Sequence, residues 1–186
     1  SAKACIPSQR ASSEEETSIT RSSEFEAKGI NYRMSPENAG CLAAAKIDCC
    51  VLANNHILDW GDEGLVETLD VLKHAGIGVA GAGMDLDAAS APVALEAGTG
   101  TRVLVFAFGT ADSGIPREWA ADPETPGVHL IDNLSSETVA RIARLVGSSK
   151  RSGDLAVASI HWGSNWSFQI PPAQRRFAHA LIDTAG

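Results

Sequence analysis

The sequence predicts an α/β fold, because apolar strands alternate with amphipathic helices along most of its 186 residues. Residues 47–53 and 155–160 are mostly apolar and suit strands that are covered on both faces. Helical segments precede and follow each of these strands. This alternation is typical of a largely parallel sheet with helices outside it. A composition with 44% hydrophobic residues is ordinary for one globular domain and allows a sizeable core.

The first 28 residues have a different composition from the rest of the chain. They are rich in Ser, Glu and Ala and carry only scattered hydrophobic side chains. Such low hydrophobicity predicts a solvated or disordered arm. The run Glu14-Glu15-Glu16 within this arm is interpreted as a solvated face rather than as a catalytic group.

Helix signals lie on both sides of the first buried strand. Ser35-Pro36-Glu37 combines an N-cap residue, a proline at the first helical position and an acid in the first turn, so a helix is expected up to Lys46. Asp62 is the expected N-cap of a second helix, which ends at Gly76. Its apolar residues recur at helical spacing, namely Leu65, Val66, Leu69 and Leu72.

The remaining elements are shorter or lie towards the end of the chain. The Gly81-Ala82-Gly83 segment predicts a tight turn, and its two glycines would also let the backbone approach a ligand. The other expected elements are, in order, a short strand over 77–80, a short helix over 86–90, a hairpin of strands 92–96 and 102–108, a long ordered loop over 110–127, a helix over 135–148, and a final helix around Phe177 and Leu181.

Charge and composition disfavour several classes of protein. The net charge is −8 and no cluster of Lys and Arg is present, which disfavours a nucleic-acid partner. No apolar run approaches the roughly 20 residues that a membrane-spanning helix needs, and no signal-peptide pattern is visible, so the compartment stays open. The four cysteines match no zinc spacing and are expected to be buried thiols that act as small hydrophobic residues.

Polar side chains follow the first buried strand directly. Asn54, Asn55, His56 and Asp59 lie within six positions. These residue types at the C-terminal end of a strand suit a hydrolytic metal centre, because the ligand crevice of an open α/β sheet lies outside the strand ends. The alternative is that the two asparagines form a turn and that Asp59 is a local cap.

The second buried strand also ends in a histidine, His161, which is followed by Trp162. His56 and His161 are therefore expected at the same edge of the sheet. Imidazole together with amide or carboxylate oxygen suits Zn, Mn or Fe, and two such ions would clamp a phosphate and activate a water. A histidine outside the coordination shell would protonate a leaving oxygen. The alternative is that each histidine is a packed, hydrogen-bonded residue and that Trp162 belongs to the core.

Several short motifs together resemble the CapA family of poly-gamma-glutamate capsule biosynthesis proteins, which is related to the calcineurin-like metallophosphoesterases. The resemblance runs from about Glu16 to the last residue. The motifs are Asn31-Tyr32-Arg33-Met34, Ala53-Asn54-Asn55-His56, Leu58-Asp59-Trp60-Gly61, Gly81-Ala82-Gly83, Ser113-Gly114-Ile115-Pro116 and His161-Trp162-Gly163.

This resemblance implies a metallophosphoesterase-like four-layer α/β/β/α sandwich with a metal site at strand ends. Asn54-Asn55-His56 is similar to a Gly-Asn-His motif of that superfamily, in which Asn55 would be a metal ligand and His56 the acid or transition-state stabiliser. His161 would be the ligand histidine that follows a buried strand. Asn54, Asp59 and Trp162 are assigned supporting roles. The implied cofactors are divalent Mn, Zn or Fe ions, dinuclear in the complete protein.

Two parts of the family pattern have no counterpart in the chain. Nothing within residues 1–15 resembles the family's Gly-Asp strand, and a later Gly-His-x-x-His-type motif would lie beyond Gly186. The resemblance therefore predicts residues 1–15 as an unmatched, disordered arm and 16–186 as a partial domain that is inactive alone.

Two functions remain open for this domain. One is a metal-dependent hydrolase or transferase that acts on a phosphate ester or a poly-gamma-glutamate-type polymer. The other is a non-catalytic accessory or export factor for the polymer. A nucleotide-binding module is disfavoured because no phosphate loop is present.

Overall fold

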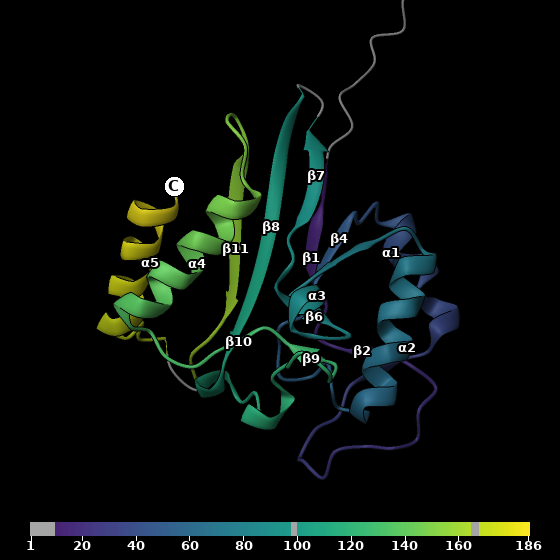
Figure 1. Cartoon of the computed structure of the whole chain (residues 1–186). Coiled ribbons are helices and arrows are strands. Elements are labelled where there is room, and N and C mark those ends of the chain that lie inside the picture. Colours follow the sequence, from purple (N-terminus) through teal and green to yellow (C-terminus); the bar gives the residue numbers. More distant parts are fainter. Residues whose placement is uncertain (1–9, 98–99, 165–167) are drawn as a thin grey trace, which may run out of the picture.

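The computed structural model describes residues 10–97, 100–164 and 168–186, and it contains two main sheets with helices outside them (Figure 1). The first sheet is parallel, in the order β1 (Ser12–Glu14), β4 (Cys49–Val51) and β5 (Gly78–Ala80). The second is built on β8 (Thr101–Thr110). The parallel strands β10 (Leu130–Ile131) and β11 (Leu155–His161) and the antiparallel strand β7 (Val93–Ala97) pair with β8.

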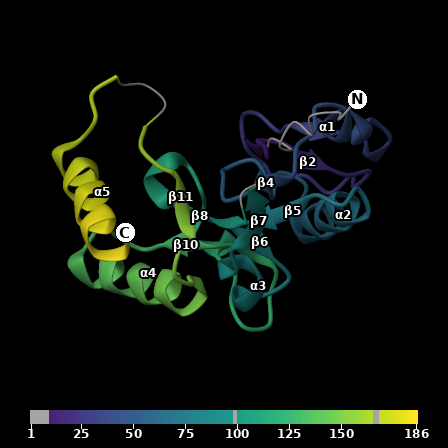
Figure 2. The same ribbon diagram turned by 90° about the horizontal axis from the view of Figure 1, so that it is seen from above.

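The helices and the shorter strands complete the mixed α/β architecture that the sequence predicts. In Figures 1 and 2, α4 and α5 lie beside the β8 sheet, whereas α1 and α2 lie beyond the other sheet. The helices are α1 (Gly40–Ala44), α2 (Gly61–His74), α3 (Leu86–Ser90), α4 (Ser136–Ser149) and α5 (Pro172–Ala185). Two small sheets pair β2 (Ser18–Ile19) with β3 (Arg33–Met34) and β6 (Ala82–Gly83) with β9 (Gly127–Val128). No helix in the described ranges is long and apolar enough to cross a membrane.

Alternating side chains of β4 divide the core into two parts. Cys50 and the following Leu52 pack in the cluster that contains Leu65 and Leu72 of α2. Cys49, in contrast, packs in a cluster between the two sheets. Because successive residues of a strand point to opposite faces, one short strand contributes to both clusters. This confirms the prediction that the first buried strand is covered on both faces, and Cys49 and Cys50 are free, buried thiols.

The central strand β8 shows the same alternation. Phe106 and Phe108 pack in the cluster that contains Ile142 of α4 and Phe177 of α5. Val105 and Ala107, which point to the opposite face, join the cluster between the sheets together with Val51 and Ala80 from the first sheet. The two sheets therefore face each other, and each has helices on its other face.

The described part of the predicted N-terminal arm is not free chain. Residues 12–14 form β1, which pairs in parallel with β4, and Glu15 donates its N–H to the Val51 carbonyl. Ser18 and Ile19 are fully buried. A long-range partner strand satisfies the backbone here and compensates for the low hydrophobicity of the segment. The prediction of disorder is wrong for residues 12–15, and residues 1–9 lie outside the described residues.

Two predicted helix starts also differ from the structure. The helix expected from Ser35 begins as a 3-10 turn over Pro36–Asn38, and only Gly40–Ala44 is α-helical. The N-cap of α2 is Trp60 rather than Asp62, and it makes no side-chain cap hydrogen bond. Gly61, with φ +66, accommodates the turn at this point.

Gly81 lies between Ala107 of β8 and Ala53, which follows β4. Its φ is +87, and a Cβ there would lie 2.7 Å from the Ala107 Cβ and 2.8 Å from the Ala53 Cβ. We expect Gly81→Ala to lower the free energy of unfolding by about 2–4 kcal/mol, because it adds both backbone strain and overpacking. Gly100→Ala is the control, since Gly100 has φ +81 but no atom within 4 Å of its Cβ position. Urea denaturation should show a loss of only about 1 kcal/mol for the control; equal losses would contradict the overpacking argument.

His129 is buried in the core, packed on Phe108 with ring centroids 4.8 Å apart. Burial, aided by the positive charge of Arg141, lowers the pKa of His129 to about 4. As the pH falls, His129 therefore binds a proton in the unfolded chain at a higher pH than in the folded chain. Stability should decline from about pH 6.5 to pH 4, by about 3 kcal/mol in all for this group. Unfolding curves of the parent and of His129→Leu across this pH range test this, because the variant should lack this part of the pH dependence.

Candidate functional site

Four side chains from distant parts of the sequence converge at one edge of the two sheets. His161 Nε2 lies 3.0 Å from Asn55 Oδ1, and His161 Nδ1 lies 2.7 Å from Glu14 Oε1. One ligand atom each from Glu14, Glu16 and His161 lies within 4.8 Å of the other two. We call Glu14, Glu16, Asn55 and His161 the strand-end cluster.

The strand-end cluster follows from the register of the sheets. His161 is the last residue of β11, opposite Gly109 of β8, and Asn55 lies shortly beyond the end of β4. Glu14 is the last residue of β1, opposite Val51. The parallel strands β1, β4 and β11 thus bring their C-terminal ends together. The predicted proximity of Asn55 and His161 is confirmed; their roles as metal ligands stay predictions.

Asn54 has a structural position beside the cluster. It is fully buried, accepts a hydrogen bond from the His56 N–H at 3.0 Å and donates one to the Glu15 carbonyl at 2.7 Å. The first contact forms a local asparagine turn, which agrees with the alternative interpretation that Asn54 and Asn55 form a turn. The second ties this turn to the segment that carries Glu14 and Glu16.

His56 is held by a buried carboxylate. Its Nδ1 lies 2.8 Å from Asp59 Oδ2, and Asp59 has no solvent-exposed surface. The same oxygen accepts the Tyr32 N–H at 2.7 Å, and the Tyr32 ring packs on the imidazole with centroids 4.3 Å apart. The contact with Asp59 uses Nδ1, so Nε2 is the nitrogen left for proton transfer.

Lys28 supplies the positive charge that Asp59 needs in this buried position. Its ammonium forms an ion pair with Asp59 Oδ1 and also donates to the main-chain carbonyl of Asn55. The same group lies 5.1 Å from the centroid of the Trp119 ring. Lys28 therefore fastens the loop before β3 to the turn that carries Asn55 and His56. No local sequence pattern marks this residue as part of the site.

The donors of the strand-end cluster fit a divalent metal ion. They comprise one imidazole nitrogen, one amide oxygen and two carboxylates, a set that suits borderline metals such as Zn or Mn. Ligand atoms on one such ion lie roughly 3–3.5 Å apart, since each is about 2.0–2.2 Å from the metal. The 3.0 Å separation of His161 Nε2 and Asn55 Oδ1 is close to this spacing, whereas Glu14 contacts the other ring nitrogen, Nδ1. Binding would exchange one of the present His161 hydrogen bonds for a metal bond.

The structure also shows which site residues the sequence analysis missed and which it misplaced. Glu14 and Glu16 are exposed, as the solvated-face interpretation predicts, but their spacing of two puts both on the side of the extended chain that meets His161. Glu15, on the other side, is partly buried, and burial raises its pKa. Trp162 does not join the strand-end cluster: its indole packs edge-on against Phe177 of α5, with centroids 6.0 Å apart.

Comparison with known proteins identifies the family. Residues 9–186 match the family described as "Bacterial capsule synthesis protein PGA_cap". The chain belongs to this family. A relative in Mycobacterium tuberculosis named "Probable polyglutamine synthesis accessory protein" is 45% identical over 170 residues, which are 90% of this chain and 45% of that protein. The "PGA biosynthesis protein CapA" of Bacillus subtilis is 27% identical over 84% of this PGA_cap chain and 39% of its own length.

A third relative, the "Capsule biosynthesis protein CapA" of Bacillus anthracis, is 26% identical over 84% of this chain and 36% of its own length. The PGA_cap chain thus spans less than half the length of these relatives. Its assignment to the bacterial capsule synthesis family confirms the resemblance that the sequence motifs indicate.

Proposed function

We propose that this chain carries a metallophosphoesterase-like metal site, which in full-length members of the family serves a metal-dependent hydrolase in the biosynthesis of a poly-gamma-glutamate-type polymer. The observation that carries the proposal is the convergence of Asn55, His161 and two carboxylates at the ends of three parallel strands. Two facing sheets with helices outside support a sandwich of the α/β/β/α type. The names of the curated relatives support the polymer.

Each residue has a distinct task in this proposal. Glu14, Glu16, Asn55 and His161 would hold a divalent ion, which supplies Lewis acidity and an activated water when it is bound. His56 lies outside the cluster and would give a proton from Nε2 to the leaving oxygen of a phosphate ester or polymer. Asp59 orients the imidazole through Nδ1. A dinuclear centre stays a prediction, because the described residues offer one such group of ligands.

Metal titration tests the site directly. We expect Mn²⁺ or Zn²⁺ to bind this chain in the micromolar range or more weakly, because four protein donors leave part of a coordination shell to water. Asn55→Ala with His161→Ala should abolish the calorimetric signal. His179→Ala is the matched control, because His179 is an exposed histidine of α5. Unaltered binding in the double variant would show that the cluster is not the metal site.

An accessory role without catalysis is the second candidate. It is supported by the word "accessory" in the name of the M. tuberculosis relative and by the engagement of both His161 ring nitrogens with protein oxygens. Hydrolysis of bis-p-nitrophenyl phosphate by the full-length relative, with and without metal, distinguishes the two candidates. Metal-dependent turnover supports the hydrolase. A strain can also be made in which both aligned histidines of its full-length relative are replaced. Normal polymer production by this strain would support the accessory role.

A further inference from the structure

The strand β11 pairs with another strand along only one of its edges. Seven of its residues pair in parallel with β8, and within the described ranges no strand pairs with its other edge. The strand has no charged residue, proline or glycine between Leu155 and His161. Natural edge strands carry such residues because they prevent unwanted pairing. By this criterion β11 has the sequence of an interior strand.

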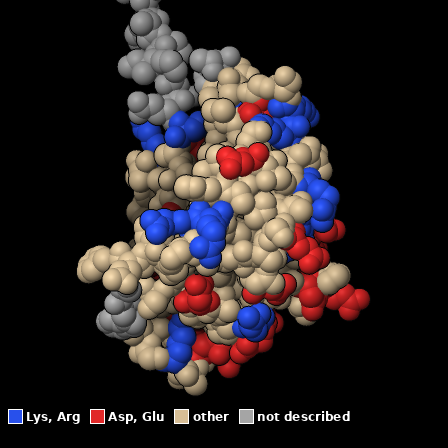
Figure 3. Space-filling model, turned by 90° about the vertical axis from the view of Figure 1, so that its left-hand side faces the viewer, with Lys and Arg blue, Asp and Glu red and all other residues tan. Residues whose placement is uncertain are grey.

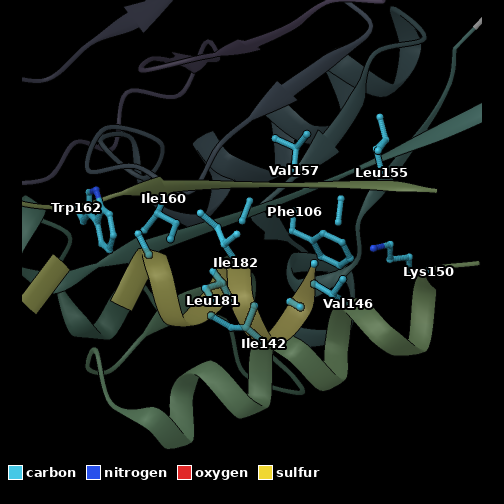
Figure 4. A pocket seen from close by; sticks show the side chains of 15 residues that line it. Phe106, Ile142, Val146, Lys150, Leu155, Val157, Ile160, Trp162, Leu181 and Ile182 are labelled. Carbon is cyan, nitrogen blue, oxygen red and sulfur yellow. The ribbon is translucent and has the colours of Figure 1, made fainter. Parts of the chain in front are cut away.

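The burial of β11 is also inconsistent with its apolar sequence. Leu155 is 60% exposed and Val157 is 45% exposed, although Val157 pairs with the buried Val105 of β8 and Leu155 pairs with the partly buried Val103. These two side chains point away from the α4–α5 side of the sheet, where Ile160 lies (Figure 4). Covering both side chains would be favourable, because it removes further apolar surface from water. The strand therefore exposes both a hydrogen-bonding edge and an apolar face.

An apolar groove adjoins the same strand on its other face. It has a volume of about 550 Å³ and lies between β11 and α5. Ile160, Leu181 and Ile182 line it (Figure 4), and Ile182 is 68% exposed. A strand that continued the sheet beyond β11 would place alternate side chains over this groove and beside Val157.

Charge favours a protein segment over a polyanion as the occupant of this surface. On the side of the molecule that carries α5, Lys and Arg are interspersed with Asp and Glu among uncharged surface (Figure 3). The curated relatives supply such a segment, because more than half of each lies outside the match to this chain. A segment of the same polypeptide would bind β11 without the entropic cost of bringing two molecules together.

We propose that the unpaired edge of β11 and the groove beside it are the interface at which this domain binds the remaining part of its longer relatives. A strand of that part pairs with β11, and its apolar side chains cover the groove and Val157. The proposal is independent of any metal at the strand-end cluster.

Hydrogen exchange tests the proposal on unmodified proteins. In this 186-residue chain, the amides on the unpaired edge of residues 155–161 should exchange rapidly. In the full-length M. tuberculosis relative, the aligned amides should exchange at least about 100-fold more slowly, because they are paired in the core of a sheet. Equal, rapid exchange in both proteins would overturn the proposal. Protection in this chain that rises with its concentration would instead identify a second copy as the occupant.

Substitution gives a second, independent test. Val157→Lys should shift the Tm of this chain by no more than about 2 °C, because the side chain is half exposed. The aligned substitution in the full-length relative should lower its Tm by about 5 °C or more, because it buries an unpaired charge. Val66→Lys on α2, where Val66 is 36% exposed, is the control and should have a small effect in both proteins. Equal effects of the Val157 substitution in the two proteins would contradict the proposed interface.

Discussion

Replacing Asp59 by Ala is expected to lower the free energy of unfolding by about 3–5 kcal/mol, among the largest effects of any single polar substitution in this chain. The carboxylate is fully buried, pairs with Lys28 and His56, and accepts the Tyr32 N–H. Its removal leaves the Lys28 ammonium without its charge partner and the Tyr32 N–H without its acceptor. Urea denaturation at neutral pH measures the loss.

A double variant separates the unpaired charge from the other contacts of Asp59. Lys28→Met combined with Asp59→Ala should recover part of the lost stability, since the uncompensated ammonium is then absent and a side chain of similar length remains. Arg10→Met with Asp48→Ala serves as the control pair. That ion pair is partly exposed, so each of its single variants should cost no more than about 1 kcal/mol. If the stability loss of the double variant equals the sum of the losses of Lys28→Met and Asp59→Ala, a direct coupling between the two residues is contradicted.

The parts of the fold that depend on local patterns could be predicted from the sequence. The strand at residues 155–160, the hairpin around Gly100 and the helix over 135–148 each have a signal within a few residues, and the structure contains all three. The ends of two apolar strands also indicated where Asn55 and His161 meet, because parallel strands bring their C-terminal ends to one edge.

The parts that depend on long-range pairing could not be predicted in the same way. β1 has three residues, none of them strongly apolar, and it becomes a strand because β4 supplies its hydrogen bonds. Glu14 and Glu16 therefore looked like a solvated acidic run. Lys28 lies in a loop without periodicity, and its contact with Asp59 spans a separation that no local pattern encodes. Half of the candidate site thus comes from segments whose sequences resemble ordinary surface.

The two strand-end histidines are expected to differ in what their loss does. If His161 is a ligand, His161→Ala should remove most of the bound metal and any metal-dependent turnover with it. If His56 is the proton donor, His56→Ala should leave the metal content nearly intact and slow turnover by a factor of about 10²–10⁴. The chemical reason is that a ligand commits its lone pair to the ion, whereas a proton donor keeps its nitrogen free. The 2.8 Å contact of His56 Nδ1 with Asp59 is consistent with the second role.

Elemental analysis measures the metal content of this chain and of the full-length M. tuberculosis relative with the aligned substitutions. Phosphodiester hydrolysis by the full-length relative measures turnover. His74→Ala is a control that should change neither, since that histidine is an exposed residue in the last turn of α2. Equal metal loss in the His56 and His161 variants would make His56 a ligand and leave the proton donor to another residue. Intact polymer production with both histidines replaced would favour the accessory role. The strand-end cluster would then serve to join β1, β4 and β11, with His161 acting through its contacts with Glu14 and Asn55.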